Sequence, residues 1–251
     1  MSNEIRIIGI TGMPEVRKGD SLAHLIFQAV QRQGETIHSG DIVVVTQKIV
    51  SKAEGQVLAL QDIDPSPFAS QLATTLGKDP RLVEVILRQT RRIVRMDKGV
   101  LITETQHGFV CANAGVDESN VEGEATVTVL PVDPDRSATE IRLGLQALFH
   151  CELAVIISDT FGRPWREGIT NVAIGVSGML PLKDYRGMVD PAGHTLRVTT
   201  LAIADELAAA AELVMGKLDR VPVALIRGYS YPKGAGGISS LLRLPERDLF
   251  R

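Results

Sequence analysis

The sequence of 251 residues has few aromatic side chains, only two cysteines and no surplus of basic charge. Aromatic residues make up 4% of the chain, so aliphatic side chains must build the core. The net charge of −3 gives no support to a protein that binds nucleic acid or a membrane surface, because either normally carries a basic surplus. No apolar run approaches the length of a membrane span or a signal-peptide core, so we expect the cytoplasm as the compartment.

Several familiar motifs are also missing. Cys111 and Cys151 are isolated and fit reduced thiols better than a disulfide. The five histidines lack metal-ligand spacing, and no Gly-x-Ser-x-Gly elbow occurs, so a covalent mechanism has no support. Neither a Gly-x4-Gly-Lys-Ser/Thr phosphate loop nor a Gly-x-Gly-x-x-Gly turn after a strand is present, and the glycines of 234–237 indicate a flexible loop.

Apolar runs of two different periods indicate a mixed α/β or α+β architecture. Strands are expected at 5–10, 42–46, 99–103, 108–112, 127–130, 153–157, 172–176 and 221–226. Helices are expected at about 20–30, over most of 65–95, at 137–149 and as one long helix at 196–217. Asp20 and Ser21 offer oxygens to cap the first helix, and the tail after residue 227 is expected to be mobile. No linker divides residues 1–251, so we expect a single unit.

Three polar segments each follow an apolar strand directly. The first, at 46–52, contains Gln47 and Lys52, and indicates either a lysine that reaches a phosphate or a solvated turn with surface lysines. The second, at 113–120, is either a self-satisfied turn or a loop in which Asp117 binds a hard cation. The third begins at residue 158, and its acid and arginines need partners if they are buried.

The third segment contains Asp159, Thr160, Arg163 and Arg166 within eight residues. If Asp117 and Asp159 converge, the two carboxylates and the Thr160 hydroxyl would leave positions on Mg²⁺ or Mn²⁺ open for phosphate oxygens. That arrangement suits phosphoryl transfer, in which positioning and charge neutralisation do most of the work. Arginines beside it can bind a phosphodiester or a carboxylate in a bidentate manner.

Four segments together resemble the coenzyme F420-0:L-glutamate ligase family, CofE, also called F420:gamma-glutamyl ligase. They are residues 12–15, 40–55, 114–120 and 158–166, in the family's order and over nearly the whole chain. The resemblance implies a CofE-like α/β fold with mixed sheets and an intertwined homodimer. Some bacterial members carry an additional flavin-binding domain, for which residues 1–251 leave no room.

The resemblance also implies an activity. Members join L-glutamate to coenzyme F420-0 in a GTP-dependent reaction through an acyl phosphate, releasing GDP and phosphate. Gamma-linked extension to F420-2 or longer products follows. The implied cofactors are two divalent ions, Mg²⁺ or Mn²⁺, with K⁺ as a further candidate, and neither nucleic acid nor membrane is an expected partner.

Site residues are carried over position by position. Asp117 and Asp159 match the metal-binding acids of the family, and Thr160 matches a ligand of a second metal. The positions that match its GTP contacts are Met13, Pro14, Glu15, Val16, Gln47, Lys52, Asn120, Met215, Gly216 and Lys217. Gln47 stands where a serine can occur.

Catalytic roles for Asp159 and Lys52 follow from the mechanism that the resemblance implies, and those for Arg163 and Arg166 come from the residues themselves. Lys52 would offset charge that develops during transfer, next to Asp159, and Arg163 and Arg166 would hold the phosphodiester or a carboxylate of the substrate. Two other readings stay open on these residues alone: a metal-dependent phosphohydrolase, and a non-catalytic nucleotide-binding or assembly module.

Overall fold

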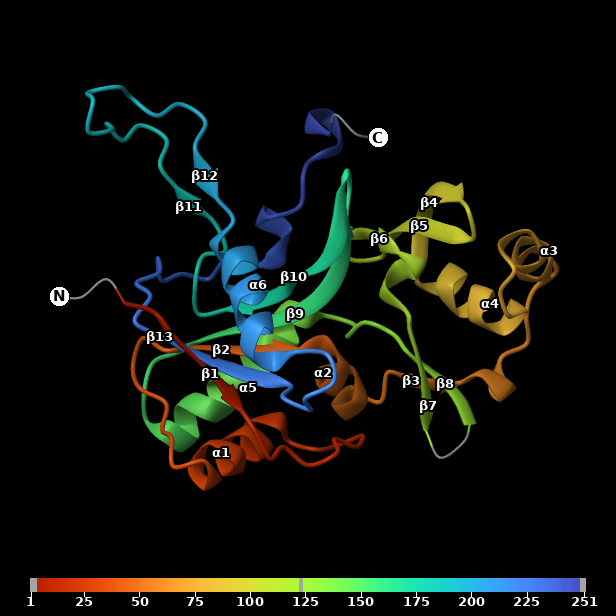
Figure 1. Cartoon of the computed structure of the whole chain (residues 1–251), viewed down its shortest axis with the longest axis horizontal. Coiled ribbons are helices and arrows are strands. Elements are labelled where there is room, and N and C mark those ends of the chain that lie inside the picture. The colour runs from red at the N-terminus through yellow and green to blue at the C-terminus, as the bar shows by residue number, and fades with distance from the viewer. Residues whose placement is uncertain (1–3, 122–123, 249–251) are drawn as a thin grey trace.

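The computed structural model describes residues 4–121 and 124–248, and its centre is a mixed five-stranded sheet (Figure 1). The strand order is β1-β13-β2-β9-β10, and only the neighbours β2 and β9 run parallel. The bounds are β1 Arg6–Ile10, β2 Ile42–Thr46, β9 Ala154–Arg163, β10 Arg166–Ser177 and β13 Val223–Arg227. The α/β fold class predicted from the sequence is confirmed.

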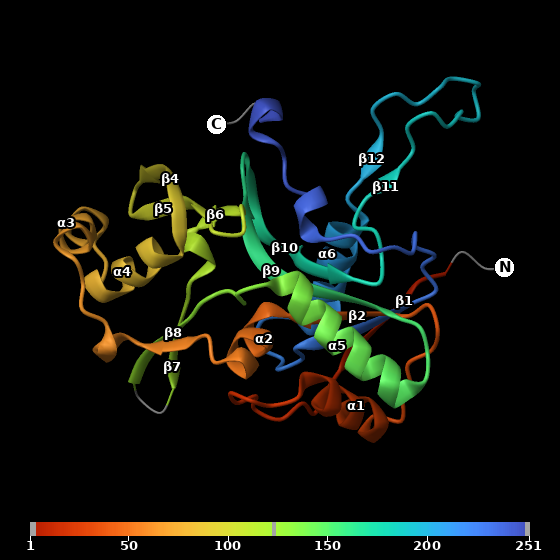
Figure 2. The same cartoon turned by 180° about the vertical axis from the view of Figure 1, so that it is seen from behind.

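Helices cover both faces of this sheet. Helix α5 (Pro134–Phe149) packs on β9 and β10 from one face, and α6 (Ile203–Met215) contacts β1, β10 and β13 from the other (Figures 1 and 2). Helix α1 (Leu22–Arg32) packs on α5, and α2 (Gln47–Glu54) follows β2 directly. The central strands read as continuous apolar runs because a strand covered on both faces has no solvent side, and Ile42 to Val45 are all buried.

A second hydrophobic cluster lies beside the sheet, in the yellow and light-green part of Figure 1. Helices α3 (Pro67–Leu76) and α4 (Pro80–Gln89) pack there beside two antiparallel three-stranded sheets. One sheet has the order β3-β8-β7, with β3 Val57–Ala59, β7 Asp117–Val121 and β8 Glu124–Thr128. The other has the order β4-β5-β6, with β4 Thr90–Asp97, β5 Val100–Thr105 and β6 Val110–Ala112.

Some predicted elements are wrong in extent. The stretch 65–95 is helical only to Gln89, because Thr90–Asp97 pairs with β5 in a hairpin instead of continuing the helix. The expected helix at 196–217 begins only at Ile203, because β12 (Thr200–Leu201) pairs with β11 (Lys183–Asp184) at the base of an arm. The Ser21 side chain makes no capping hydrogen bond to α1, and Asp20 instead accepts one from the Arg17 N–H at 2.7 Å.

The C-terminal segment was expected to be a mobile tail; the part around Ile238 instead packs on the main core, whereas residues 243–247 are exposed. Ile238 is buried in the main core, and its N–H donates to Asp135 Oδ2 at 2.9 Å. The short 3-10 turns Ile238–Ser240 and Pro245–Arg247 follow. Apolar anchoring at Ile238 outweighs the conformational freedom of the preceding glycines.

Cys111 and Cys151 are free thiols. Within residues 4–121 and 124–248, no helix has both the length and the apolar character needed to cross a membrane.

The packing of α5 on β10 depends on a residue without a side chain. A Cβ at Gly175 would lie 2.4 Å from the carbonyl oxygen of Pro134, whereas a Cβ at Gly162, in the partner strand β9, would meet nothing within 4 Å. We expect Gly175→Ala to lower the free energy of unfolding by about 1–3 kcal/mol, because the helix must move away. Urea unfolding followed by circular dichroism measures this, with Gly162→Ala as the matched control. Equal stability of the two variants would contradict this account of the packing.

Candidate active site

A cavity of about 770 Å³ opens where the main sheet meets the second cluster, at the end of β2 and beside residues 159–162 of β9. Five segments line it: 13–16 after β1, 46–52 around the start of α2, 111–117, the β9–β10 hairpin, and 212–222 between α6 and β13. The parallel register of β2 on β9 sets Thr46 beside Ser158, so that the residues after both face the same space. A cavity of this volume suits a small-molecule ligand.

The cavity brings together most of the residues that the sequence suggested. These are Met13, Pro14, Glu15, Val16, Gln47, Lys52, Asp117, Asp159, Thr160, Met215, Gly216 and Lys217. They come from segments up to about two hundred residues apart in the chain. Their convergence is a property of the fold that no single motif contains.

Two predicted residues whose side chains the structure describes are not among the lining groups. Arg163 and Arg166 are exposed at the turn of the β9–β10 hairpin, where the Arg163 guanidinium donates to the carbonyl of Glu167. Their catalytic roles stay predictions, and the cavity gives them no support. The backbone of Asn120 belongs to β7, and its side chain lies outside the described part of the structure.

The cluster at residue 158 does not stand at a strand end, as its polarity suggested. Strand β9 continues through Arg163, and β7 likewise begins at Asp117 inside the expected loop. Pairing with β10 and β8 satisfies the backbone there, so polar side chains can stand on extended hairpins that leave the core.

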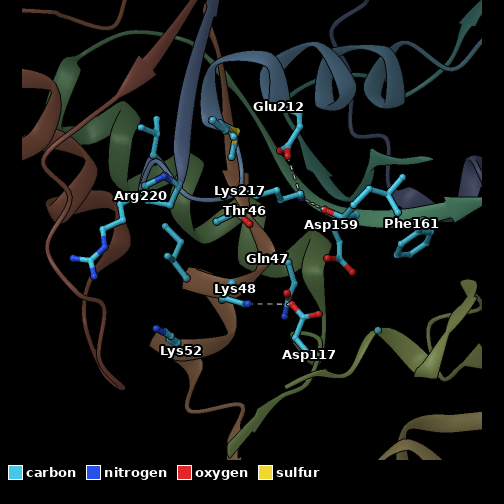
Figure 3. Close-up of a pocket in the computed structure, with 18 of the residues that line it drawn as sticks. Thr46, Gln47, Lys48, Lys52, Asp117, Asp159, Phe161, Glu212, Lys217 and Arg220 are labelled. Carbon is cyan, nitrogen blue, oxygen red and sulfur yellow. Dashed lines mark hydrogen bonds and ion pairs between the residues drawn. The ribbon is translucent and has the colours of Figure 1, made fainter. Parts of the chain in front are cut away.

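Two carboxylates from different sheets face the cavity. Burial raises the pKa of Asp159 to about 7; the Thr160 N–H opposes this rise and the nearby Asp117 carboxylate adds to it. The Asp117 carboxylate is half exposed and pairs with Lys48, with 3.4 Å between Nζ and Oδ2 (Figure 3). The pKa of Asp159 is raised because burial disfavours the charged carboxylate by more than the neighbouring Lys217 and Lys48 ammoniums favour it.

This acid pair fits one hard divalent cation. Carboxylate oxygens are preferred ligands of Mg²⁺ and Mn²⁺, and the carboxylates of Asp117, Asp159 and Glu212 outnumber the two ammoniums near them, those of Lys48 and Lys217. Among the described residues, no group of three or more His, Cys, Asp or Glu side chains is arranged to hold a metal. Water and substrate oxygens would therefore complete the shell, which is usual for Mg²⁺.

Lys52 and Gln47 are held differently on α2. The Lys52 ammonium pairs with Glu15, which keeps the pKa of that carboxyl below its usual range. Gln47 is only 1% exposed, and its amide donates to Ser51 Oγ at 2.6 Å and to the Val129 carbonyl at 3.2 Å. The Gln47 side chain thus fixes α2 against the second cluster, and its predicted contact with GTP has no free side-chain donor in this arrangement.

A ring of four polar side chains, the Thr160 network, closes the wall of the cavity beside Asp159. Thr160 Oγ1 donates to Asn171 Oδ1 at 2.7 Å and accepts from Lys217 Nζ. Lys217 Nζ lies 3.1 Å from Glu212 Oε1, and Asn171 Nδ2 donates to Glu212 Oε2 at 2.7 Å. The network joins β9, β10 and the end of α6, and Figure 3 shows Lys217 between Glu212 and the hairpin.

Sequence reasoning missed Glu212, Asn171 and Arg220. Arg220 lines the cavity from the turn before β13, with a left-handed φ of 56°. Glu212 lies inside the run predicted as a helix, and Asn171 stands directly before the strand predicted at 172–176, so that a single polar residue gave the only signal at each position.

Comparison with known proteins gives the family. A family model described as F420-0:Gamma-glutamyl ligase matches residues 11–228. The chain belongs to this family. Its membership confirms the resemblance inferred from four short segments, and it makes the protein a ligase that forms an amide-type bond, which disfavours the reading as a non-catalytic module.

Individual relatives are similar over almost their full length. The coenzyme F420:L-glutamate ligase of Methanothermobacter thermautotrophicus is 51% identical over 250 residues, which cover 98% of this chain and 99% of the relative. The ligase of the same name from Methanopyrus kandleri is 48% identical over 242 residues, covering 94% of each chain. That of Methanocaldococcus jannaschii is 44% identical over 251 residues, covering 99% and 97%.

Cys111 lines the cavity but should be unreactive. Burial raises its pKa to about 12, and the negative charge of Asp159 adds to the rise, so the neutral thiol predominates at pH 8. We expect iodoacetamide at pH 8 to modify Cys111 far more slowly in the folded ligase than in urea, as measured by peptide mass spectrometry. Cys151 is less buried and serves as the internal comparison. Equal rates at Cys111 in folded and unfolded protein would contradict the described environment.

Proposed function

We propose that this ligase joins L-glutamate to coenzyme F420-0, uses GTP to activate the acceptor carboxylate, and continues with gamma-linked additions. The relatives' names support the acceptor and the amino acid. The observation that carries the nucleotide part is one cavity in which cationic side chains from two segments, 46–52 and 212–222, lie together with an acid pair.

Charge in the cavity is suited to a polyphosphate. The cationic lining groups are Lys48, Lys52, Lys217 and Arg220, and the acidic ones are Glu15, Asp117, Asp159 and Glu212. Each of the three lysines pairs with one of these acids, which holds its ammonium at the wall. Phosphate oxygens can therefore bind cations that are already positioned, and lysine serves phosphate as a point charge.

The proposed chemistry has two transfers. An oxygen of the acceptor carboxylate attacks the γ-phosphorus of GTP, the bond from that phosphorus to the β,γ-bridging oxygen breaks, and GDP leaves. The amine of glutamate then attacks the acyl carbon, phosphate leaves as the carbon–oxygen bond breaks, and one proton passes to solvent. A divalent ion held by Asp117 and Asp159, Mg²⁺ or Mn²⁺, would neutralise phosphate charge when bound.

The chain's own groups have definite parts in this scheme. Lys52 and Lys217 stabilise negative charge that builds on the transferred phosphoryl group. Residues 13–16 and 215–217 both line the cavity and would enclose the nucleotide. Enclosure matters because an acyl phosphate is lost to hydrolysis if water reaches it.

We also propose that the protein works as a homodimer in the cytoplasm. The arm between β11 and β12 extends away from the body (Figures 1 and 2), and it exposes Met188, Val189 and Val198, the last by 86%. Apolar side chains gathered on one projecting arm indicate an interaction surface. The free thiols support a reducing compartment.

The direct test supplies all substrates. With GTP, Mn²⁺, L-glutamate and coenzyme F420-0, we expect release of GDP and a coenzyme heavier by one or more glutamate residues, read by mass spectrometry. Release of phosphate at full rate without glutamate would favour the phosphohydrolase reading instead. Neither GDP nor a mass increase would overturn the proposal.

The acid pair can be tested by substitution. Asp159→Asn and Asp117→Asn each remove a carboxylate that would hold the divalent ion, and that ion would neutralise the phosphate charge. We therefore expect a loss in kcat/KM of about a hundredfold or more. The matched control is Asp64→Asn, an exposed carboxylate outside the cavity, which should keep the activity. Circular dichroism checks the fold. Full activity of folded Asp159→Asn would contradict the assignment of this site.

A further inference from the structure

The Thr160 hydroxyl is poorly suited to bind a second metal ion. The family resemblance assigns it to a second metal ion, yet in the structure its hydrogen goes to Asn171 and one of its acceptor positions takes a hydrogen bond from the Lys217 ammonium. A hydroxyl has one donor and two acceptor positions. A divalent ion on the same oxygen would lie close to the ammonium and be repelled by it, so the residues do not fit a second metal.

Lys217 is fixed in this position by its neighbours. Glu212 gives one carboxylate oxygen to Lys217 at 3.1 Å and the other to the amide of Asn171 at 2.7 Å. Asn171 is 4% exposed, and it orients both the Glu212 carboxylate and the Thr160 hydroxyl. The ammonium is thereby held on the rim of the cavity with its side chain half exposed, where a ligand can reach it.

The acid pair of Asp117 and Asp159 and the Thr160 network differ in the net charge of their side chains. Lys48 pairs with Asp117, and the ammoniums of Lys217 and Lys48 both act on Asp159; because Lys217 is also paired with Glu212, three carboxylates face two ammoniums, which leaves negative charge at the acid pair for a metal. In the Thr160 network, one carboxylate faces one ammonium, and the hydroxyl and amide are neutral. A metal is therefore attracted to the first position and has no such attraction at the second.

We infer that the Lys217 ammonium takes the place of a second metal ion in this ligase, so that one divalent ion and one fixed lysine together bind the phosphate chain. Glu212 and Asn171 are positioning residues that hold the lysine. The inference rests on the proposed use of GTP and specifies how that nucleotide is bound.

The first test counts ions. Equilibrium dialysis of the purified protein with Mn²⁺ and guanosine 5′-(β,γ-imido)triphosphate gives the bound nucleotide and the bound Mn²⁺ in the same sample. We expect one nucleotide and one Mn²⁺ per protomer. Two Mn²⁺ per bound nucleotide would overturn the inference and leave the proposed function intact. Absence of nucleotide binding would overturn the proposed function, and the inference with it.

The second test asks whether the charge of Lys217 binds the nucleotide. A charge-assisted hydrogen bond to phosphate predicts that Lys217→Gln weakens binding of the same analogue by about tenfold to a hundredfold at constant Mn²⁺. Lys217→Arg keeps the charge and should recover most of the affinity, which a purely structural role would not predict. Lys233→Gln removes an exposed charge outside the cavity as the matched control. Unchanged affinity in Lys217→Gln would refute the role of the lysine.

Discussion

The parallel pairing of β2 with β9 is the contact on which the site depends. It is the one parallel pair in the main sheet, and it sets Thr46 beside Ser158. Helix α2 with Lys52 leaves the end of the first strand, and the Asp159 hairpin continues from the second. A slip of one residue in this register would reverse which face each side chain occupies, and would send Asp159 away from the cavity.

The burial of β2 and β9 then determines the electrostatics of the cavity. A carboxylate next to an apolar core is costly to ionise, and the pKa of Asp159 near 7 records this cost. The surrounding lysines offset part of it, yet each is also paired with an acid of its own. The cavity thus keeps its charges in near balance, while a metal ion and a phosphate chain can each bind to groups that are already in place.

Much of this could be predicted from the sequence. The strand predicted at 42–46 has the bounds of β2, because five β-branched residues in succession are typical of a doubly covered strand. Most of the residues transferred from the family resemblance line one cavity, although their roles stay predictions. What failed depends on long-range pairing: residues 90–97 join a hairpin, and residues 158–163 prolong a strand, because partners supplied by the fold override local polarity.

The Thr160 network could not be predicted for a related reason. The hydrogen bond between Asn171 and Glu212 forms only because β10 and α6 are adjacent in the fold, and the spacing of these two residues in the sequence matches no motif. A lysine at position 217 is visible in the sequence, but its contact with Thr160 arises across 57 residues of chain. Local pattern identifies the groups available for chemistry, and the tertiary fold decides which of them neutralise one another.

The central claim is that one cavity couples GTP cleavage to amide formation. The most direct measurement is the ratio of GDP formed to glutamate residues incorporated, determined in one reaction by nucleotide chromatography and mass spectrometry of the coenzyme. The account predicts a ratio of one at every stage of chain growth. Incorporation of glutamate without GDP, or GDP formation at the same rate when glutamate is omitted, would contradict it.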